Sequence, residues 1–84
     1  MSVRSRLQTT LTRILAEAGA SGELSDSTSL MRSGLVDSTG LVELAEFVER
    51  EVRNPLDLST VNLEQDWDTM DDIVQFIERA RSVR

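Results

Sequence analysis

The chain has 84 residues, a formal net charge of −6 and a pI near 4.5, and all nine of its basic residues are arginines. This length predicts one small domain, residues 1–84, and the acidity excludes nucleic acid as a partner because phosphate groups repel such a surface. The sequence has no run of about 20 apolar residues, no apolar N-terminal signal and no cysteine, so we expect a cytoplasmic protein without a membrane span or disulfides.

A helical pattern of apolar residues predicts a first helix from about Ser2 to Ala18, ended by Gly19. Its buried face is expected to consist of Val3, Leu7, Leu11, Ile14, Leu15 and Ala18. Small polar residues then favour turns over helix, so a long loop follows. Single apolar residues are expected to pin this loop to the core, at Leu24, Leu30, Met31 and Leu35.

A second helix is predicted to open at Asp37-Ser38 and to stop before Asn54-Pro55, because the residue that precedes a proline avoids helical geometry. Its apolar stripe comprises Leu41, Leu44, Ala45, Val48 and Val52. Phe47 lies on one flank of this helix, where core packing is the simplest role for an aromatic ring and the lining of a cargo cavity is the alternative.

Two further elements complete the prediction. A short helix or turn is expected over Leu56–Leu63, with Ser59 as its N-cap. Asp68 and Thr69 are expected to cap a last helix, in which Asp72 completes a capping box with Thr69. The buried face of that helix is predicted to be Met70, Ile73, Val74 and Ile77, and the chain ends, including Arg81–Arg84, are expected to fray. The fold class is therefore all-α, a small bundle with three longer helices and one short one.

Four aspartates near the last helix, Asp66, Asp68, Asp71 and Asp72, do not match a calcium-binding loop. Such a loop requires Asp or Asn at position 70 and glycine at position 71, where this chain has Met70 and Asp71. Helix capping explains the acidic residues better, so no metal site is expected. Trp67, within the same segment, is expected to anchor the loop against the last helix.

The start of the second helix holds the best candidate for a functional residue. Asp37 is a good N-cap, and it places Ser38 and Thr39 in the first helical turn. The Ser38 hydroxyl is expected to be exposed at this helix start, with Gly40 leaving space near it. A helix N-terminus also favours a negatively charged substituent. Taken alone, Asp-Ser-Thr is most simply a capping cluster. The chain has no histidine, lysine or cysteine, which argues against Ser38 as a catalytic nucleophile and against an enzyme.

The surrounding sequence resembles the acyl and peptidyl carrier proteins. The matching residues are Leu30, then Ser33-Gly34-Leu35-Val36-Asp37-Ser38, Leu41-Val42-Glu43-Leu44, Glu49 to Val52, Pro55 and Trp67-Asp68-Thr69-Met70. The resemblance spans about residues 7–80. One departure is Thr39, since that position in the family is usually leucine, isoleucine or methionine.

The resemblance implies that Ser38, preceded by Asp37, carries a covalent 4′-phosphopantetheine group. A phosphopantetheinyl transferase would attach the group from coenzyme A, and the thiol of the arm would hold an acyl or aminoacyl cargo as a thioester. Enzymes that activate, modify or release the cargo are the further implied partners. The Thr39 departure bears on which transferase acts and how fast.

The second helix is the recognition surface in this family, so the resemblance suggests Val42, Glu43, Glu46 and Glu49 as the partner-binding residues. Arg50 and Arg53 interrupt the acidity of that face. We expect a free-standing, monomeric acyl carrier, because the chain begins with methionine and holds one domain. Two alternatives remain open, an aminoacyl or peptidyl carrier of a specialised pathway and an unmodified acidic helical adaptor.

Overall fold

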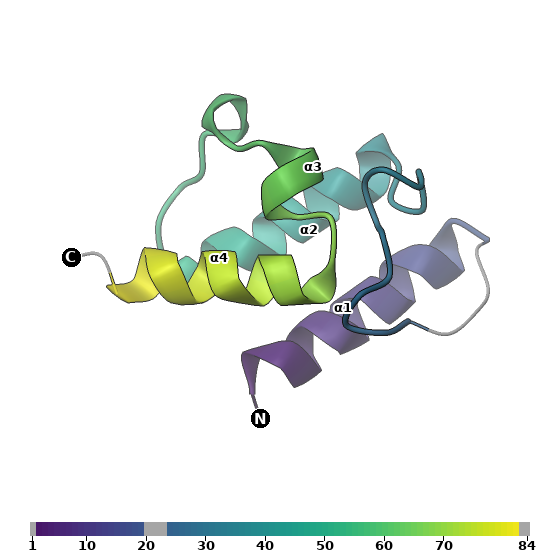
Figure 1. Cartoon of the computed structure of the whole chain (residues 1–84), viewed down its shortest axis with the longest axis horizontal. Helices are drawn as coiled ribbons and strands as arrows, with labels where there is room; N and C mark the ends of the chain where they lie inside the picture. The colour runs from purple at the N-terminus through teal and green to yellow at the C-terminus, as the bar shows by residue number, and fades with distance from the viewer. Residues whose placement is uncertain (1, 20–23, 83–84) are drawn as a thin grey trace.

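The computed structural model describes residues 2–19 and 24–82, which form an all-α bundle (Figure 1). Its elements in chain order are α1 (Val3–Glu17), α2 (Ser38–Val52), the 3-10 turn η1 (Leu58–Thr60), α3 (Leu63–Asp66) and α4 (Met70–Ser82). No strand occurs in these two ranges. The predicted fold class is confirmed, with three longer helices and one short helix. None of these helices combines the length and the apolar character needed to cross a bilayer.

The core lies where α1, α2 and α4 pack against one another (Figure 1). The apolar stripes predicted from the sequence supply most of it, because residues three and four apart share one side of a helix. Its fully buried side chains include Leu7 and Leu11 from α1, Leu44 and Val48 from α2, and Ile73 and Ile77 from α4. The segments between helices add Leu30, Val36 and Trp67, and the ring of Trp67 meets Phe76 edge to face at 5.5 Å between centroids.

The helix starts follow the predicted capping chemistry. Ser2 caps α1, and its hydroxyl oxygen accepts the backbone N–H of Ser5 at 3.1 Å. Thr69 and Asp72 form the predicted capping box, with N–H to oxygen distances of 3.1 and 3.3 Å. The helix boundaries are therefore confirmed to within one or two residues for α1 and α2.

The prediction that Ser59 caps the short element is wrong. Asp57 caps η1 instead, and its carboxylate accepts both the backbone N–H of Ser59 at 3.0 Å and the Ser59 hydroxyl at 2.6 Å. These hydrogen bonds, led by the one from the hydroxyl, hold the pKa of Asp57 below its ordinary value. Asn62 in turn caps α3. The Asp57 carboxylate is a stronger hydrogen-bond acceptor than the Ser59 hydroxyl. Ser59 therefore donates to Asp57 and lies within the turn that Asp57 closes.

The prediction that Arg81 frays is also wrong, whereas Arg84 and Met1 lie outside the described residues. The Nε of Arg81 donates to the backbone carbonyl of Glu51 at 2.8 Å, and its guanidinium pairs with the Glu51 carboxylate. Arg6 binds the same carboxylate through two hydrogen bonds of 2.8 and 2.9 Å. Glu51 therefore links all three long helices, and chiefly the Arg6 hydrogen bond holds the pKa of its carboxyl below the ordinary value.

Candidate functional site

Ser38 is the first residue of α2 and is exposed to solvent. Asp37 before it has extended backbone, and its Oδ1 accepts the N–H of Gly40 at 2.8 Å, while its carbonyl accepts the N–H of Leu41 at 2.8 Å. Asp37 is thus the N-cap, as predicted, and the capping role does not occupy the Ser38 hydroxyl. The hydroxyl stands at the positive end of α2.

Gly40 serves the packing of α1 rather than the space around Ser38. The residue is buried, and a Cβ atom placed on it would lie 2.7 Å from Cγ2 of Ile14 and 3.3 Å from Cγ1 of Val36. The structure therefore gives Gly40 a different role from the predicted one of leaving room beside the Ser38 hydroxyl. Its missing side chain lets α1 approach the first turn of α2, which fixes the position of the turn that bears Ser38.

The loop before α2 is held by Asp68, a residue that the sequence pattern predicts to cap the last helix. Oδ1 of Asp68 accepts three hydrogen bonds, from the Ser29 hydroxyl at 2.8 Å and from the backbone N–H groups of Met31 at 3.1 Å and Arg32 at 3.0 Å. The N–H of Leu30 donates to the Asp68 carbonyl at 2.5 Å. The pKa of Asp68 is lowered, mainly by the N–H of Arg32. Thr69 alone caps α4, which leaves Asp68 available for the loop.

This contact continues toward Ser38 through the backbone. The N–H of Val36 donates to the carbonyl of Leu30 at 3.1 Å, and both side chains are buried. Gly34, with φ of 77°, makes the turn between them in a region that favours glycine. The start of α4 therefore positions the segment that leads into α2. Sequence reasoning missed this role because Asp68 and Ser29 are 39 residues apart.

The four predicted partner-binding residues differ in their surroundings. Val42 is 56% exposed, the one large exposed apolar side chain in the described ranges, and Glu46 is also exposed. Glu43 pairs with Arg13 of α1 at 3.4 Å. Oε2 of Glu49 accepts the N–H of Leu56 at 3.0 Å, so this carboxylate holds the turn after α2. Val42 and Glu46 are thus the residues of the four most available for contact.

A groove of about 350 Å³ lies beside Ser38, between the end of α1 and the start of α2. It is lined by Ile14, Glu17, Ala18, Asp37, Thr39, Gly40 and Glu43. A phosphodiester on the neighbouring Ser38 would be attracted by the α2 dipole and repelled by the carboxylates of Asp37 and Glu43. Both effects are weak in water at this exposed position, and a covalent ester does not depend on them. Ser38 does not line this groove itself, and its exposed hydroxyl stands next to it in the chain.

The acidic residues around α4 are engaged in structural contacts. Asp71 pairs with Arg4 at 2.9 Å, Asp72 closes the capping box, and Asp66 accepts the N–H of Asn62 at 3.2 Å. The described residues contain no group of three or more His, Cys, Asp or Glu side chains that could hold a metal ion. Asp66 and Asp72 therefore hold the turns in which they lie, and Asp71 links α4 to α1.

Comparison with known proteins does not assign the chain to a family. No family model matches the sequence, and the searches of curated proteins and of solved structures found no match.

Proposed function

We propose that this protein is a carrier whose Ser38 bears a 4′-phosphopantetheine arm, on which an acyl or aminoacyl group travels as a thioester. The observation that carries the proposal is the placement of Ser38, exposed on the first turn of α2 while Asp37 alone caps the helix. The proposal also rests on the sequence resemblance around Ser38 and on the all-α arrangement that the resemblance implied.

The chain's own contribution is to present a hydroxyl in a fixed position. Gly40 and Ile14 lock the first turn of α2 against α1, and Asp68 holds the loop that enters it. A transferase can therefore dock on a rigid helix start. Only one rotatable bond, between Cα and Cβ, lies between the Ser38 backbone and its hydroxyl oxygen. Pre-organisation of this kind lowers the entropy lost when the two proteins dock.

The attachment reaction uses no group of this chain other than the Ser38 hydroxyl. Oγ of Ser38 forms a bond to the coenzyme A phosphorus that bears the pantetheine chain, the bond from that phosphorus to 3′,5′-ADP breaks, and 3′,5′-ADP leaves. The hydroxyl proton passes to a base of the transferase, because this chain has no histidine or lysine to receive it. When attached, the arm supplies the thiol that this cysteine-free chain lacks.

The test is an intact-mass measurement after incubation with coenzyme A, Mg²⁺ and a promiscuous phosphopantetheinyl transferase. Wild type should gain one phosphopantetheine mass and Ser38→Ala none. Ser27→Ala, which removes an exposed serine hydroxyl from the loop before α2, is the matched control and should gain the mass. No gain in wild type would favour the unmodified adaptor instead, and a gain in Ser38→Ala would mean that a residue other than Ser38 is modified.

The cargo class needs a second measurement. The modified protein purified from its source would be cleaved at the thioester, and the released acid identified by mass spectrometry. A fatty or polyketide-type acid indicates an acyl carrier, and an amino acid indicates the aminoacyl alternative.

A further inference from the structure

Ser38 lies close to two segments of the chain that are held by different helices. The first turn of α2, which includes Ser38, is fixed by the Asp37 cap and by the contact of Gly40 with α1. The loop 31–35, which precedes this turn, is bound to Asp68 at the start of α4. The Asp68 hydrogen bonds involve none of the residues that fix the first turn. The loop can therefore be disturbed while the helix start stays in place.

The loop 31–35 has little hold of its own. None of its side chains is buried, although Leu30 before it and Val36 after it are both buried in the core. The N–H of Val36 donates to the Leu30 carbonyl and closes the base of the loop, and the N–H of Gly34 donates to the Met31 carbonyl at 3.2 Å. The loop runs past the connection between α3 and α4, where Asp68 lies (Figure 1).

Asp68 is a firm base for this loop. Trp67 directly before it and Met70 two residues after it are both buried, so the backbone of Asp68 cannot shift without disturbing the packed core. Its Oδ1 accepts the N–H groups of both Met31 and Arg32. One oxygen thus fixes the first two residues of the loop.

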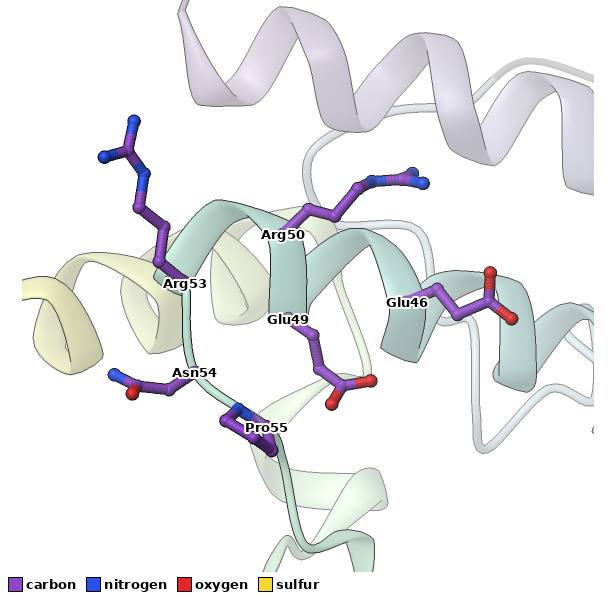
Figure 2. A pocket seen from close by; sticks show the side chains of 6 residues that line it. All are labelled: Glu46, Glu49, Arg50, Arg53, Asn54 and Pro55. Carbon is purple, nitrogen blue, oxygen red and sulfur yellow. The ribbon is translucent and has the colours of Figure 1, made fainter.

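The far end of α2 offers no comparable surface near Ser38. An open hollow of about 440 Å³ lies there, where the chain leaves the helix (Figure 2). Figure 2 shows Arg50 and Arg53, which border the hollow, pointing in opposite directions, so they do not form one binding surface. Arg50 is also about 18 Å from Ser38 along the helix axis, at the rise of an α-helix. The loop 31–35 is much nearer to Ser38 in the chain.

We propose that Asp68 is a positioning residue for the enzymes that act at Ser38, and that it holds the loop 31–35 in the shape on which they dock. This role rests on the proposed function, because it concerns the enzymes that modify Ser38 or load its arm. A loop that is already ordered loses less entropy when a partner docks on it. The Ser38 hydroxyl is held by α2, so Asp68 acts on docking and not on the chemical step. Its loss raises KM and leaves kcat unchanged.

A purely structural role for Asp68 makes a different prediction. Loss of its hydrogen bonds would lower the free energy of unfolding. At a temperature where the variant remains folded, KM would then equal that of wild type.

The experiment measures initial rates of phosphopantetheine transfer at saturating coenzyme A and varied concentrations of this protein. Asp68→Ala should raise KM about tenfold, as expected if two backbone residues must be ordered again on docking, and kcat should stay within about twofold. Asp68→Asn keeps an oxygen acceptor and should leave KM within about twofold of wild type. Asp71→Ala removes a carboxylate from the first turn of α4 that pairs with Arg4 and not with the loop, so it is the matched control and should leave KM unchanged.

Gly34→Ala disturbs the same loop without removing a core contact, so it serves even if Asp68→Ala does not fold. Gly34 has φ 77°, and a Cβ atom on it would meet nothing within 4 Å. Alanine is strained in this conformation, so the variant should reshape the loop and raise KM at unchanged kcat. Gly19→Ala, at φ 79° and with equally open surroundings, is the control for strain and should leave KM unchanged.

An unchanged KM in Gly34→Ala or in a folded Asp68→Ala overturns this role, and so does a fall in kcat at unchanged KM. A defect in Asp68→Asn as large as that in Asp68→Ala overturns it too, because the acceptor is then not the cause. If wild type gains no mass, the proposed function fails and the role of Asp68 fails with it. The two failures are distinguishable, since the kinetic comparison begins from a wild type that is modified.

Discussion

The Cγ2 methyl group of Ile14 lies 2.7 Å from the point where a Cβ atom would stand on Gly40. Ile14 is 2% exposed, and its branched side chain has little freedom to turn away. The first turn of α2, which bears Ser38, is thus in direct contact with α1. This contact determines whether a side chain at position 40 stabilises or destabilises the protein.

Gly40→Ala should destabilise the protein by about 1 kcal/mol. An alanine inside a helix ordinarily gains up to about 1 kcal/mol over glycine, whereas overpacking a filled core costs about 1–3 kcal/mol. Chemical denaturation followed by the fluorescence of Trp67, which is fully buried and the only tryptophan, measures the change. In an Ile14→Leu background, which moves the branch away from Cβ, Gly40→Ala should become stabilising. An unchanged sign in that background would show that Ile14 is not the cause.

Replacement of Glu51 should weaken the link between α1, α2 and α4. Its carboxylate is 12% exposed and binds both Arg6 and Arg81, so Glu51→Gln should lower the free energy of unfolding by about 1–3 kcal/mol. Glu78→Gln, at an exposed position of α4, should change it by less than about 0.5 kcal/mol.

The same carboxylate predicts a pH dependence with a definite sign. The pKa of Glu51 is lowered by folding, so its stabilisation is complete above the ordinary value of about 4.3 and is lost as the pH falls through the folded value. Urea midpoints measured across this acid range should therefore fall more steeply for wild type than for Glu51→Gln. Parallel curves for the two proteins would contradict the assignment.

Asp68→Ala should release the loop that leads to Ser38. One oxygen, Oδ1, accepts all three hydrogen bonds from that loop, so the loss should be about 2–3 kcal/mol. Asp68→Asn retains an acceptor in the same place and should cost about 1 kcal/mol or less. Amide hydrogen exchange at Met31 and Arg32 should accelerate in the alanine variant and far less in the asparagine variant. Equal effects of both variants would point to the charge and not to the hydrogen bonds.

Thr39→Leu should raise the rate at which a promiscuous transferase modifies Ser38, by about threefold to fivefold. Thr39 is exposed beside Ser38, and a larger apolar side chain there would bury further surface on docking, at about 0.8 kcal/mol per methylene. Stability should change by less than about 0.5 kcal/mol. Thr12→Leu, at an exposed position of α1, is the control and should leave the rate unchanged. Initial rates of mass gain provide the measurement.

Arg53→Gly should stabilise the protein by about 1 kcal/mol, because glycine adopts the left-handed conformation at φ 60° without strain. For a domain of this size the melting temperature should rise by about 4–8 °C. Arg53→Ala removes the same charge but keeps the strain, so it should not raise the melting temperature. If both variants gain equally, the benefit comes from the loss of the charge.

Much of the bundle could be predicted because the signals are local. The apolar spacings of residues 3–18 and 41–52 place the two helices, and Thr69 with Asp72 places the start of α4. The errors at Ser59 and Arg81 have different origins. Ser59 donates to Asp57, which is only two residues earlier, so the local sequence already held the stronger acceptor. Arg81 binds Glu51 of another helix, 30 residues away, and that contact depends on the packing of the helices.

The candidate site also has features that the sequence predicts and features that it does not. Asp37 as N-cap and an exposed Ser38 follow from the sequence, since capping involves residues within three positions of each other. The role of Asp68 and the status of Glu43 and Glu49 do not follow from it. They depend on contacts with Ser29, Arg13 and Leu56. The path of the backbone in three dimensions determines which of these side chains and backbone groups come within hydrogen-bonding distance.

By itself the sequence determined the helical class, the helix boundaries and the exposed serine at the start of α2, because short-range periodicity and capping encode them. The tertiary structure decided that Gly40 admits α1, that Asp68 braces the loop before Ser38 and that Glu51 links α1, α2 and α4. Those relationships join residues that are far apart in the chain. Only the packed arrangement of three helices brings such groups together or keeps them apart.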